Sequence, residues 1–156
     1  MRCNMRLALY QPDIAGNVGT IMRLCACMGV PLDIVMPCGF PLSDRDLKRA
    51  AMDYGGQAEV TLHRNDADFL AMVEQHRLRL VLMTVRGSAP MPTHRFAPDD
   101  LILMGSEGAG VPDHVHDRAD IRLRIPMREG FRSLNIAVAA GIALGQALEQ
   151  TGLYPQ

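Results

Sequence analysis

Long apolar runs are missing from this chain of 156 residues. A membrane-spanning helix needs about 20 consecutive apolar residues, and the most apolar helical segment, residues 136–148, is shorter than that. The amino terminus leads directly into a strand-like run and carries no signal-peptide pattern. We therefore expect a cytoplasmic protein with no membrane association. Internal repeats, linkers and low-complexity segments are also missing, so residues 1–156 are predicted to form a single domain.

Metal-binding patterns of cysteine and histidine are missing as well. The four cysteines are Cys3, Cys25, Cys27 and Cys38. Cys25 and Cys27 are two residues apart on a predicted helix, so their side chains point in different directions and do not share an ion. Free, buried thiols are expected instead. Because His114 and His116 have no further ligands at a matching spacing, we expect exposed histidines and no metal.

Lysine is almost absent, since Lys48 is the only one and every other basic side chain is an arginine. The planar guanidinium of arginine suits phosphate groups, but a GC-rich genome would produce the same bias. A net charge of −1 argues against a strongly basic nucleic-acid-binding protein. Composition therefore leaves the partner open.

Short apolar runs alternate with segments of helical periodicity. Strands are predicted at residues 6–10, 32–36, 58–62, 78–85, 101–104 and 121–125. Helices are predicted from residue 20 to 28, and over residues 44–52, 66–75 and 136–148. Ser43 precedes the second helix as its N-cap, and Asn65 or Asp66 caps the third. This alternation predicts an α/β fold with a mostly parallel sheet and helices on both of its faces.

The helix expected over residues 136–148 is unusual because small and apolar residues surround it. Alanine and glycine occupy seven of its positions, with Ile136, Val138, Ile142 and Leu144 between them. A helix that is apolar all round is normally buried on most sides, so we expect this one to lie inside the molecule. Ser133 and Asn135 precede it, either as simple caps or as site residues.

Three loops follow predicted strands at the end where open parallel sheets bind ligands. They are residues 86–88, 105–112 and 126–135. Loop 105–112 is rich in glycine, which permits close backbone approach. It lacks the G-x-G-x-x-G spacing and the P-loop lysine, and Glu107 would repel a pyrophosphate, so a nucleotide-binding oxidoreductase domain is disfavoured. Each loop alone could be a turn, but together they indicate a site.

Three segments resemble the motifs of one family when they are taken together. They are residues 17–23, 105–112 and 125–135, the last with Ile125-Pro126-Met127 and Arg132-Ser133-Leu134-Asn135. In this order the segments resemble the three motifs of the SPOUT superfamily, and more narrowly those of the TrmH-type RNA 2′-O-ribose methyltransferases. Residues 9–14, 23–26 and the pair Asp53-Tyr54 resemble the minimal members, which methylate the ribose of the tRNA wobble nucleotide without an extra amino-terminal RNA-binding domain.

The resemblance implies a fold and a cofactor. The fold would contain a carboxy-terminal trefoil knot formed by about residues 78–150, with the last helix threaded through a loop. The protein would be a homodimer whose site is completed across the interface. Its cofactor would be S-adenosylmethionine, giving S-adenosylhomocysteine as product and bound against Met83, Gly105, Ile125 and Ser133.

The resemblance also implies catalytic roles for Arg23, Asn17, Glu107, Ser133 and Asn135. The guanidinium of Arg23 is always protonated, so we expect it to hold the adjacent phosphate and to stabilise the developing alkoxide rather than to accept a proton. Read alone, Arg23 would be a solvated helix residue, but it follows Asn17 and Gly19 in an expected tight loop and has apolar neighbours.

The expected substrate is the wobble position, nucleotide 34, of a tRNA, with leucine isoacceptors as first candidates. The alternatives are another tRNA or rRNA nucleotide, or a non-catalytic RNA-binding module. RNA affinity is expected to come from an arginine patch and to weaken with salt. Its candidate residues are Arg45, Arg49, Arg128 and Arg132. Ala137 and the loop 128–131 depart from the family pattern, which bears on substrate preference.

Overall fold

Seven parallel strands form one sheet in the computed structural model, which describes residues 4–53 and 57–156. The predicted roles of Cys3 and Tyr54 therefore fall outside the described residues. The order across the sheet is β3-β2-β1-β6-β4-β7-β5, and each neighbouring pair is parallel. The strands are β1 (Arg6–Tyr10), β2 (Leu32–Val35), β3 (Val60–His63), β4 (Arg79–Met83), β5 (Ala89–Pro90), β6 (Asp100–Met104) and β7 (Ile121–Arg124).

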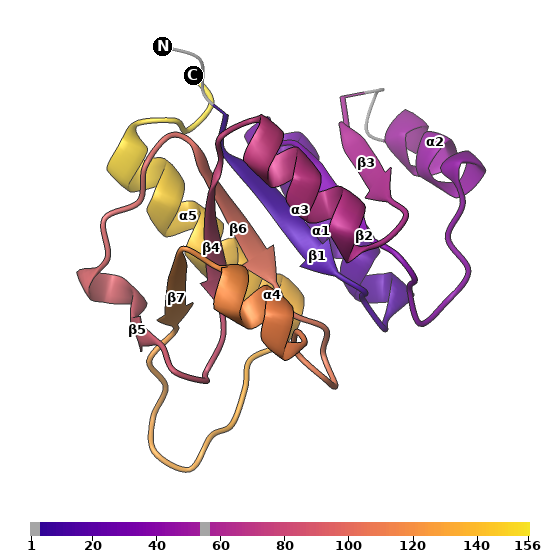
Figure 1. Ribbon diagram of the computed structural model, residues 1–156. Helices are drawn as coiled ribbons and strands as arrows, with labels where there is room; N and C mark the ends of the chain where they lie inside the picture. The colour runs from indigo at the N-terminus through magenta and orange to yellow at the C-terminus, as the bar shows by residue number, and fades with distance from the viewer. Residues whose placement is uncertain (1–3, 54–56) are drawn as a thin grey trace.

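Helices cover both faces of this sheet, as Figure 1 shows. The apolar side chains of α1 and α5 pack on one face, and those of α3 and α4 pack on the other. The predicted α/β class is thus confirmed. The helices are α1 (Ala15–Met28), α2 (Asp44–Asp53), α3 (Asp66–Gln75), α4 (Asp113–Arg118) and α5 (Ile136–Thr151), with a short 3-10 helix at Met91–Thr93.

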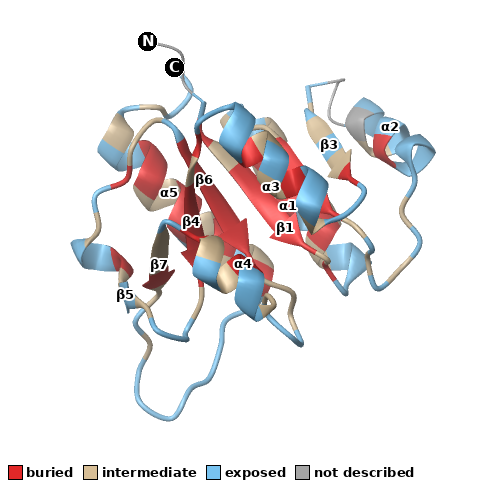
Figure 2. Cartoon of the chain, viewed as in Figure 1, coloured by how far each residue is buried: buried red, intermediate tan, exposed pale blue. Residues whose placement is uncertain are grey.

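The central strands supply both cores because their side chains alternate between the two faces. Leu7 and Leu9 of β1 join the core under α1 and α5, while Ala8 and Tyr10 join the core under α3. Figure 2 shows β1, β4 and β6 as continuously buried ribbons. Strands buried on both faces are apolar along their whole length, which is why the sequence reveals them.

The start of α1 differs from the prediction. Helix α1 begins at Ala15 rather than near Thr20, so the expected loop around Asn17 and Gly19 is the first part of the helix. Ile14 occupies the N-cap position and makes no side-chain capping bond. The sequence therefore lacks a start signal there, and burial of Val18, Ile21 and Met22 against the sheet stabilises the helix instead.

Helix α5 is also less buried than its composition predicts. Ile136, Ala140 and Ala143 face the sheet and are buried, whereas Val138 is 52% and Ile142 is 42% exposed. The expectation of burial on most sides is wrong for a single chain, because α5 lies in the outer layer with α1 beside it and no further layer outside it. An apolar outer face therefore remains.

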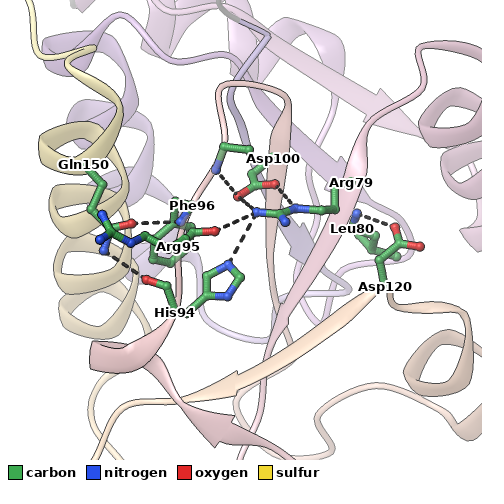
Figure 3. Close-up of polar contacts among 9 residues, drawn as sticks. Arg79, Leu80, His94, Arg95, Phe96, Asp100, Asp120 and Gln150 are labelled. Atoms are coloured by element: carbon green, nitrogen blue, oxygen red, sulfur yellow. Dashed lines mark hydrogen bonds and ion pairs between the residues drawn. The ribbon is translucent and has the colours of Figure 1, made fainter.

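Polar contacts fasten α5 at the amino ends of β4 and β6 (Figure 3). The Gln150 side-chain oxygen accepts the Phe96 N–H at 2.8 Å, and its amide nitrogen donates to the His94 carbonyl at 3.1 Å. Arg79 donates to both oxygens of the buried Asp100, at 2.6 and 2.9 Å. These contacts hold the turn before β6 against α5 at the amino ends of the strands. Loops 105–112 and 126–135 lie at the opposite, carboxyl ends.

The cysteines and histidines follow the predictions in part. Cys25 is a buried free thiol, but Cys27 is exposed because it points outward from α1. His114 is exposed and bonds to Asp66, whereas His116 is half-buried against the Arg86 carbonyl. Across residues 4–53 and 57–156 there is no group of three potential metal ligands. No helix in the same ranges has the length and apolar character of a membrane span.

Candidate active site

A cavity of about 270 Å³ opens at the carboxyl ends of β4, β6 and β7. The four predicted cofactor residues, Met83, Gly105, Ile125 and Ser133, all line its wall. Its further lining includes residues that the sequence reading did not single out, among them Thr84, Val85, Met127 and Leu134. Each of these residues belongs to a strand end or loop already assigned to the site. The sequence did not show that these particular residues line the cavity.

The glycines of loop 105–110 are required by its shape. A Cβ atom on Gly105 would lie 2.9 Å from the Gly110 Cα, closer than side chains tolerate. Gly110 itself has a φ of 65°, which favours glycine. Ser106 and Gly110 exchange two backbone hydrogen bonds of 3.0 Å that close the loop. At Gly105 and Gly110 the loop therefore presents backbone rather than side chains to the cavity.

A chain of hydrogen bonds joins the three motifs at the cavity. Asn17 on α1 donates to one oxygen of Glu107 at 3.2 Å, and the other oxygen accepts the Asp13 N–H at 2.8 Å. Asn135 donates to the Asn17 side-chain oxygen at 3.1 Å. Residues 118 positions apart in the sequence are thereby in direct contact, and Glu107 lies on the cavity wall.

The direction of this chain is fixed at its Asn135 end. The Asn135 side-chain oxygen accepts the Ala137 N–H at 2.8 Å and the Val138 N–H at 3.3 Å, which caps α5. Its amide nitrogen must then face Asn17, so that Asn17 in turn donates toward Glu107. Since both Glu107 oxygens receive donors, this carboxyl has to accept twice, as an ionised carboxylate does.

Arg23 lies apart from this cluster. It is exposed on α1 and borders a second, separate hollow together with Cys27, Asp53 and Gln57. Six helical residues separate it from Asn17, a rotation of about 240° at 3.6 residues per turn, so it faces another direction. The structure brings Asn17, Glu107, Ser133 and Asn135 to one site but not Arg23, whose side chain is exposed although its neighbours in sequence are apolar.

The predicted RNA-binding arginines form two groups rather than one patch on a single chain. Arg45 and Arg49 are exposed on α2, and Arg128 and Arg132 are exposed on the loop between β7 and α5. In Figure 1 this loop and α2 lie on opposite sides of the molecule. A continuous basic surface would therefore have to combine more than one chain.

Cys38 lies close to the polar cluster. Burial raises the pKa of its thiol to about 11, and the negative charges of Asp13 and Glu107 add to the effect. The thiol is therefore protonated at neutral pH and does not act as a nucleophile.

Comparison with known proteins gives a consistent assignment. Residues 4–145 match the model of the SpoU rRNA Methylase family. A tRNA (cytidine(34)-2′-O)-methyltransferase from Beijerinckia indica is 51% identical over 146 residues, covering 94% of this chain and 91% of that protein. A relative of the same name from Escherichia coli is 34% identical and covers 97% of this chain and 96% of its own.

Solved structures agree with the sequence relatives. A structure described as giving insights into the 2-OH methylation of C/U34 on tRNA has a TM-score of 0.83 and 40% identity, and the match covers 94% of this chain and 95% of the other. An AdoMet-bound rRNA methyltransferase from Sinorhizobium meliloti has a TM-score of 0.79 and 28% identity, over 96% of this chain and 57% of the other.

The resemblance seen in the three motifs, including that to the minimal members that methylate the tRNA wobble nucleotide, is confirmed by these relatives. With its parallel sheet, its glycine loop at the cavity and a family match over most of its length, the chain belongs to the SpoU rRNA Methylase family.

Proposed function

We propose that this protein transfers a methyl group from S-adenosylmethionine to the ribose 2′-hydroxyl of nucleotide 34 of a tRNA. The observation that carries the proposal is the cavity at the strand ends, which residues of loops 105–112 and 125–135 line and to which the Glu107–Asn17–Asn135 chain joins α1. Relatives named tRNA (cytidine(34)-2′-O)-methyltransferase, one of them 51% identical, support the same reaction. Leucine isoacceptors are the first candidates, and the reaction is expected in the cytoplasm.

The cavity suits a cofactor with an apolar body and a few polar groups. Met83, Leu123 and Ile125 give it apolar walls, and Ser133 adds a hydroxyl. Gly105 leaves open the backbone surface that a side chain would fill. When bound, S-adenosylmethionine supplies a methyl group on a sulfonium, which is electrophilic without help from a metal.

The residues of the site then have distinct tasks in the proposed reaction. Asn135 and Ser133 orient the ribose hydroxyl or the cofactor carboxylate beside the cavity. Glu107 fixes loop 105–110 through the Asp13 N–H and Asn17. Arg23 holds the adjacent phosphate and stabilises negative charge as the hydroxyl loses its proton. Positioning and charge stabilisation of this kind can supply most of the catalysis in a transfer between two bound groups.

We further propose that the protein works as a homodimer. Arg23 borders a hollow separate from the cavity of its own chain, so a second copy has to supply the arginine that the reaction requires. The outer face of α5 offers a contact surface, because Val138 and Ile142 are exposed there and Ile14 at the start of α1 is 51% exposed. Exposed apolar surface of this kind is typical of interfaces.

A trefoil knot formed by about residues 78–150 remains part of the proposal. The contacts that would retain a threaded helix are those of its last turns. Gln146 donates to the Met91 carbonyl at 3.3 Å, and Gln150 bonds to Phe96 and His94, so that the segment before β6 is fastened to α5 at three points.

The proposed reaction is tested by incubating the protein with radiolabelled S-adenosylmethionine and with purified tRNA or rRNA in separate reactions. Labelling of tRNA alone is expected. Labelling of rRNA alone would support the alternative substrate, an rRNA nucleotide, in line with the name of the SpoU rRNA Methylase family. Labelling of neither RNA would contradict methyl transfer to RNA.

A further inference from the structure

The loop between β7 and α5 carries an aromatic side chain in an unusual position. The loop projects from the body of the molecule (Figure 1), and Phe131 within it is 71% exposed. Its neighbours Arg128, Glu129 and Arg132 are exposed as well. Burial of apolar surface is favourable, so a ring this exposed beside charged residues is available for contact with a partner.

The loop holds this side chain close to the cavity. Met127, Ser133 and Leu134 of the same loop line the cavity wall, so Phe131 is two residues from the wall in sequence. The Phe131 N–H donates to the Arg128 carbonyl at 3.3 Å, and Gly130 has a φ of 91°. A residue with a side chain rarely adopts that conformation, so the glycine defines the turn that presents Phe131.

The charges around Phe131 favour RNA over a protein partner. Arg128 and Arg132 have no ion pair within residues 4–53 and 57–156, so their guanidinium groups are available to phosphates. Glu129 reduces the loop's charge to a net +1 without forming a pair with either arginine. The core of a protein interface is depleted of charged residues as a class, whereas aromatic and arginine side chains together are the usual contacts of unpaired nucleotides.

We propose that Phe131 is a stacking platform for an unpaired base adjacent to the methylated nucleotide, with Arg128 and Arg132 on the flanking phosphates. The inference rests on the proposed function, because it requires an RNA whose target ribose reaches the cavity. It adds a substrate-binding residue, and it explains why this activity would act on a loop nucleotide rather than on a base-paired one.

The absence of tryptophan from the chain allows a direct test. A Phe131→Trp variant contains a single indole, whose fluorescence is quenched when a base stacks on it. Titration with an anticodon stem-loop RNA should quench it saturably, whereas a fully paired RNA of equal length should not. Tyr154→Trp is the matched control, since Tyr154 is an exposed aromatic residue two positions from the carboxy terminus, which lies at the end of the molecule opposite to this loop (Figure 1). Equal quenching by both RNAs, or in both variants, would overturn the stacking.

Kinetics provide the second arm. Phe131→Ala should raise the KM for the RNA roughly tenfold, as loss of one stacked base implies, while Phe131→Tyr should keep the wild-type value. The affinity for S-adenosylmethionine and the sedimentation coefficient should be the same in wild type and in both variants. Loss of cofactor affinity in Phe131→Ala would instead place the ring against the cofactor, and loss of the dimer would place it in a subunit interface. Either result overturns the inference.

Failure of the inference is distinguishable from failure of the proposed function. If wild-type protein methylates the stem-loop but Phe131→Ala does so equally well, the stacking is wrong and the reaction stands. If the stem-loop quenches the Phe131→Trp variant but wild-type protein transfers no methyl group to it, the loop binds RNA and the proposed reaction is wrong.

Discussion

Glu107 is the residue on which the polar cluster depends, because each of its carboxylate oxygens receives a donor. Glutamine has nearly the same shape, yet its amide nitrogen would face either Asn17 or the Asp13 N–H, both of which are donors. Asn17 cannot turn round, since the Asn135 oxygen is held by the Ala137 and Val138 N–H groups. Glu107 therefore stabilises the cluster because both of its oxygens accept hydrogen bonds, and a side chain of the same shape does not replace it.

The first prediction concerns Glu107→Gln. One unsatisfied donor costs about 1–3 kcal/mol, so the variant should unfold at a lower temperature and transfer methyl groups at least tenfold more slowly. Glu74→Gln, an exposed carboxylate on α3, is the matched control and should behave as wild type. Thermal unfolding and single-turnover methylation measure the two effects. Wild-type values for Glu107→Gln would show that the cluster is incidental.

Asp33 is a second residue whose charge has a measurable consequence. It is fully buried on β2, where Arg6 approaches one oxygen at 2.7 Å and His63 approaches the other at 2.7 Å. Burial raises the pKa of the Asp33 carboxyl, but the hydrogen bonds from His63 and Arg6 outweigh it, so that the pKa lies below its ordinary value. The ionised carboxylate thus stabilises the folded state.

The second prediction follows from this lowered pKa of Asp33 in the folded state. A carboxyl whose folded-state pKa is lowered contributes stability above its unfolded pKa of about 4, and this stability is lost as the pH falls through the folded value. Asp33→Asn should lower the free energy of unfolding at pH 7 by about 3 kcal/mol and should flatten its decline below pH 4. Urea unfolding between pH 2 and 7 measures both effects. Asp68→Asn is the control: it removes an exposed ion pair with Arg64 and should change the free energy of unfolding little. Parallel curves of unfolding free energy against pH for wild type and Asp33→Asn would contradict the prediction.

At the scale of elements, loop 105–110 is the part of the site with the tightest steric requirement. The third prediction is that Gly105→Ala lowers the affinity for S-adenosylmethionine at least tenfold, because the added Cβ would lie 2.9 Å from the Gly110 Cα and displace the loop. Calorimetric titration with the cofactor measures this.

Gly16→Ala is the control for this substitution. A Cβ at Gly16 meets nothing within 4 Å, and α1 should gain roughly 0.5–1 kcal/mol of stability from alanine. Its cofactor affinity should be that of wild type. Equal affinities for Gly105→Ala and wild type would show that the loop does not form the cofactor wall.

The predictability of the elements follows from the signals that each contains. Strands β1, β4 and β6 were predictable because residues 7–10, 80–83 and 101–104 are buried and carry apolar side chains, and α3 because the Asn65 side chain accepts the Asp68 N–H as its cap. The start of α1 was not predictable, since Ile14 gives no capping signal. Strand β5 has two residues, too few for any periodicity.

The site was predictable to the same extent. Strand ends and a glycine-rich loop predict a site at the carboxyl ends of the strands, where the cavity lies, whereas Met83, Gly105, Ile125 and Ser133 were named through the family resemblance. The direction of Arg23 relative to Asn17 depends on where α1 begins, and the sequence gives no capping signal for that start. Contacts between distant residues, such as Asn17 with Asn135, depend on tertiary packing that local patterns do not encode.

At the scale of the whole molecule, the composition of α5 and its surroundings point to a second subunit. Its small residues allow close approach to the sheet, but Val138 and Ile142 stay exposed in one chain. In the proposed dimer, α5 would have two packing partners, the sheet on one side and another copy on the other.

The fourth prediction is that Val138→Arg converts a dimer into a monomer and lowers methyl transfer at least a hundredfold. A charge buried in an apolar contact is strongly unfavourable, so the two copies would separate. Arg23 of one copy would then no longer reach the cavity of the other. Sedimentation and activity are measured together. Met52→Arg places the same charge on α2, where Met52 is 78% exposed, and should leave the dimer intact. A wild-type monomer with full activity would contradict this account.

The central claim is methylation of the wobble ribose by a site that needs Arg23. Its most direct measurement is to incubate unmodified tRNA with S-adenosylmethionine and either wild-type protein or Arg23→Ala, and then to map 2′-O-methylated nucleotides along the tRNA. The account predicts a single methylated ribose at nucleotide 34 with wild-type protein. It predicts at least a hundredfold slower reaction with Arg23→Ala, at an unchanged affinity for the cofactor. Methylation at another nucleotide, or wild-type turnover by Arg23→Ala, would contradict it.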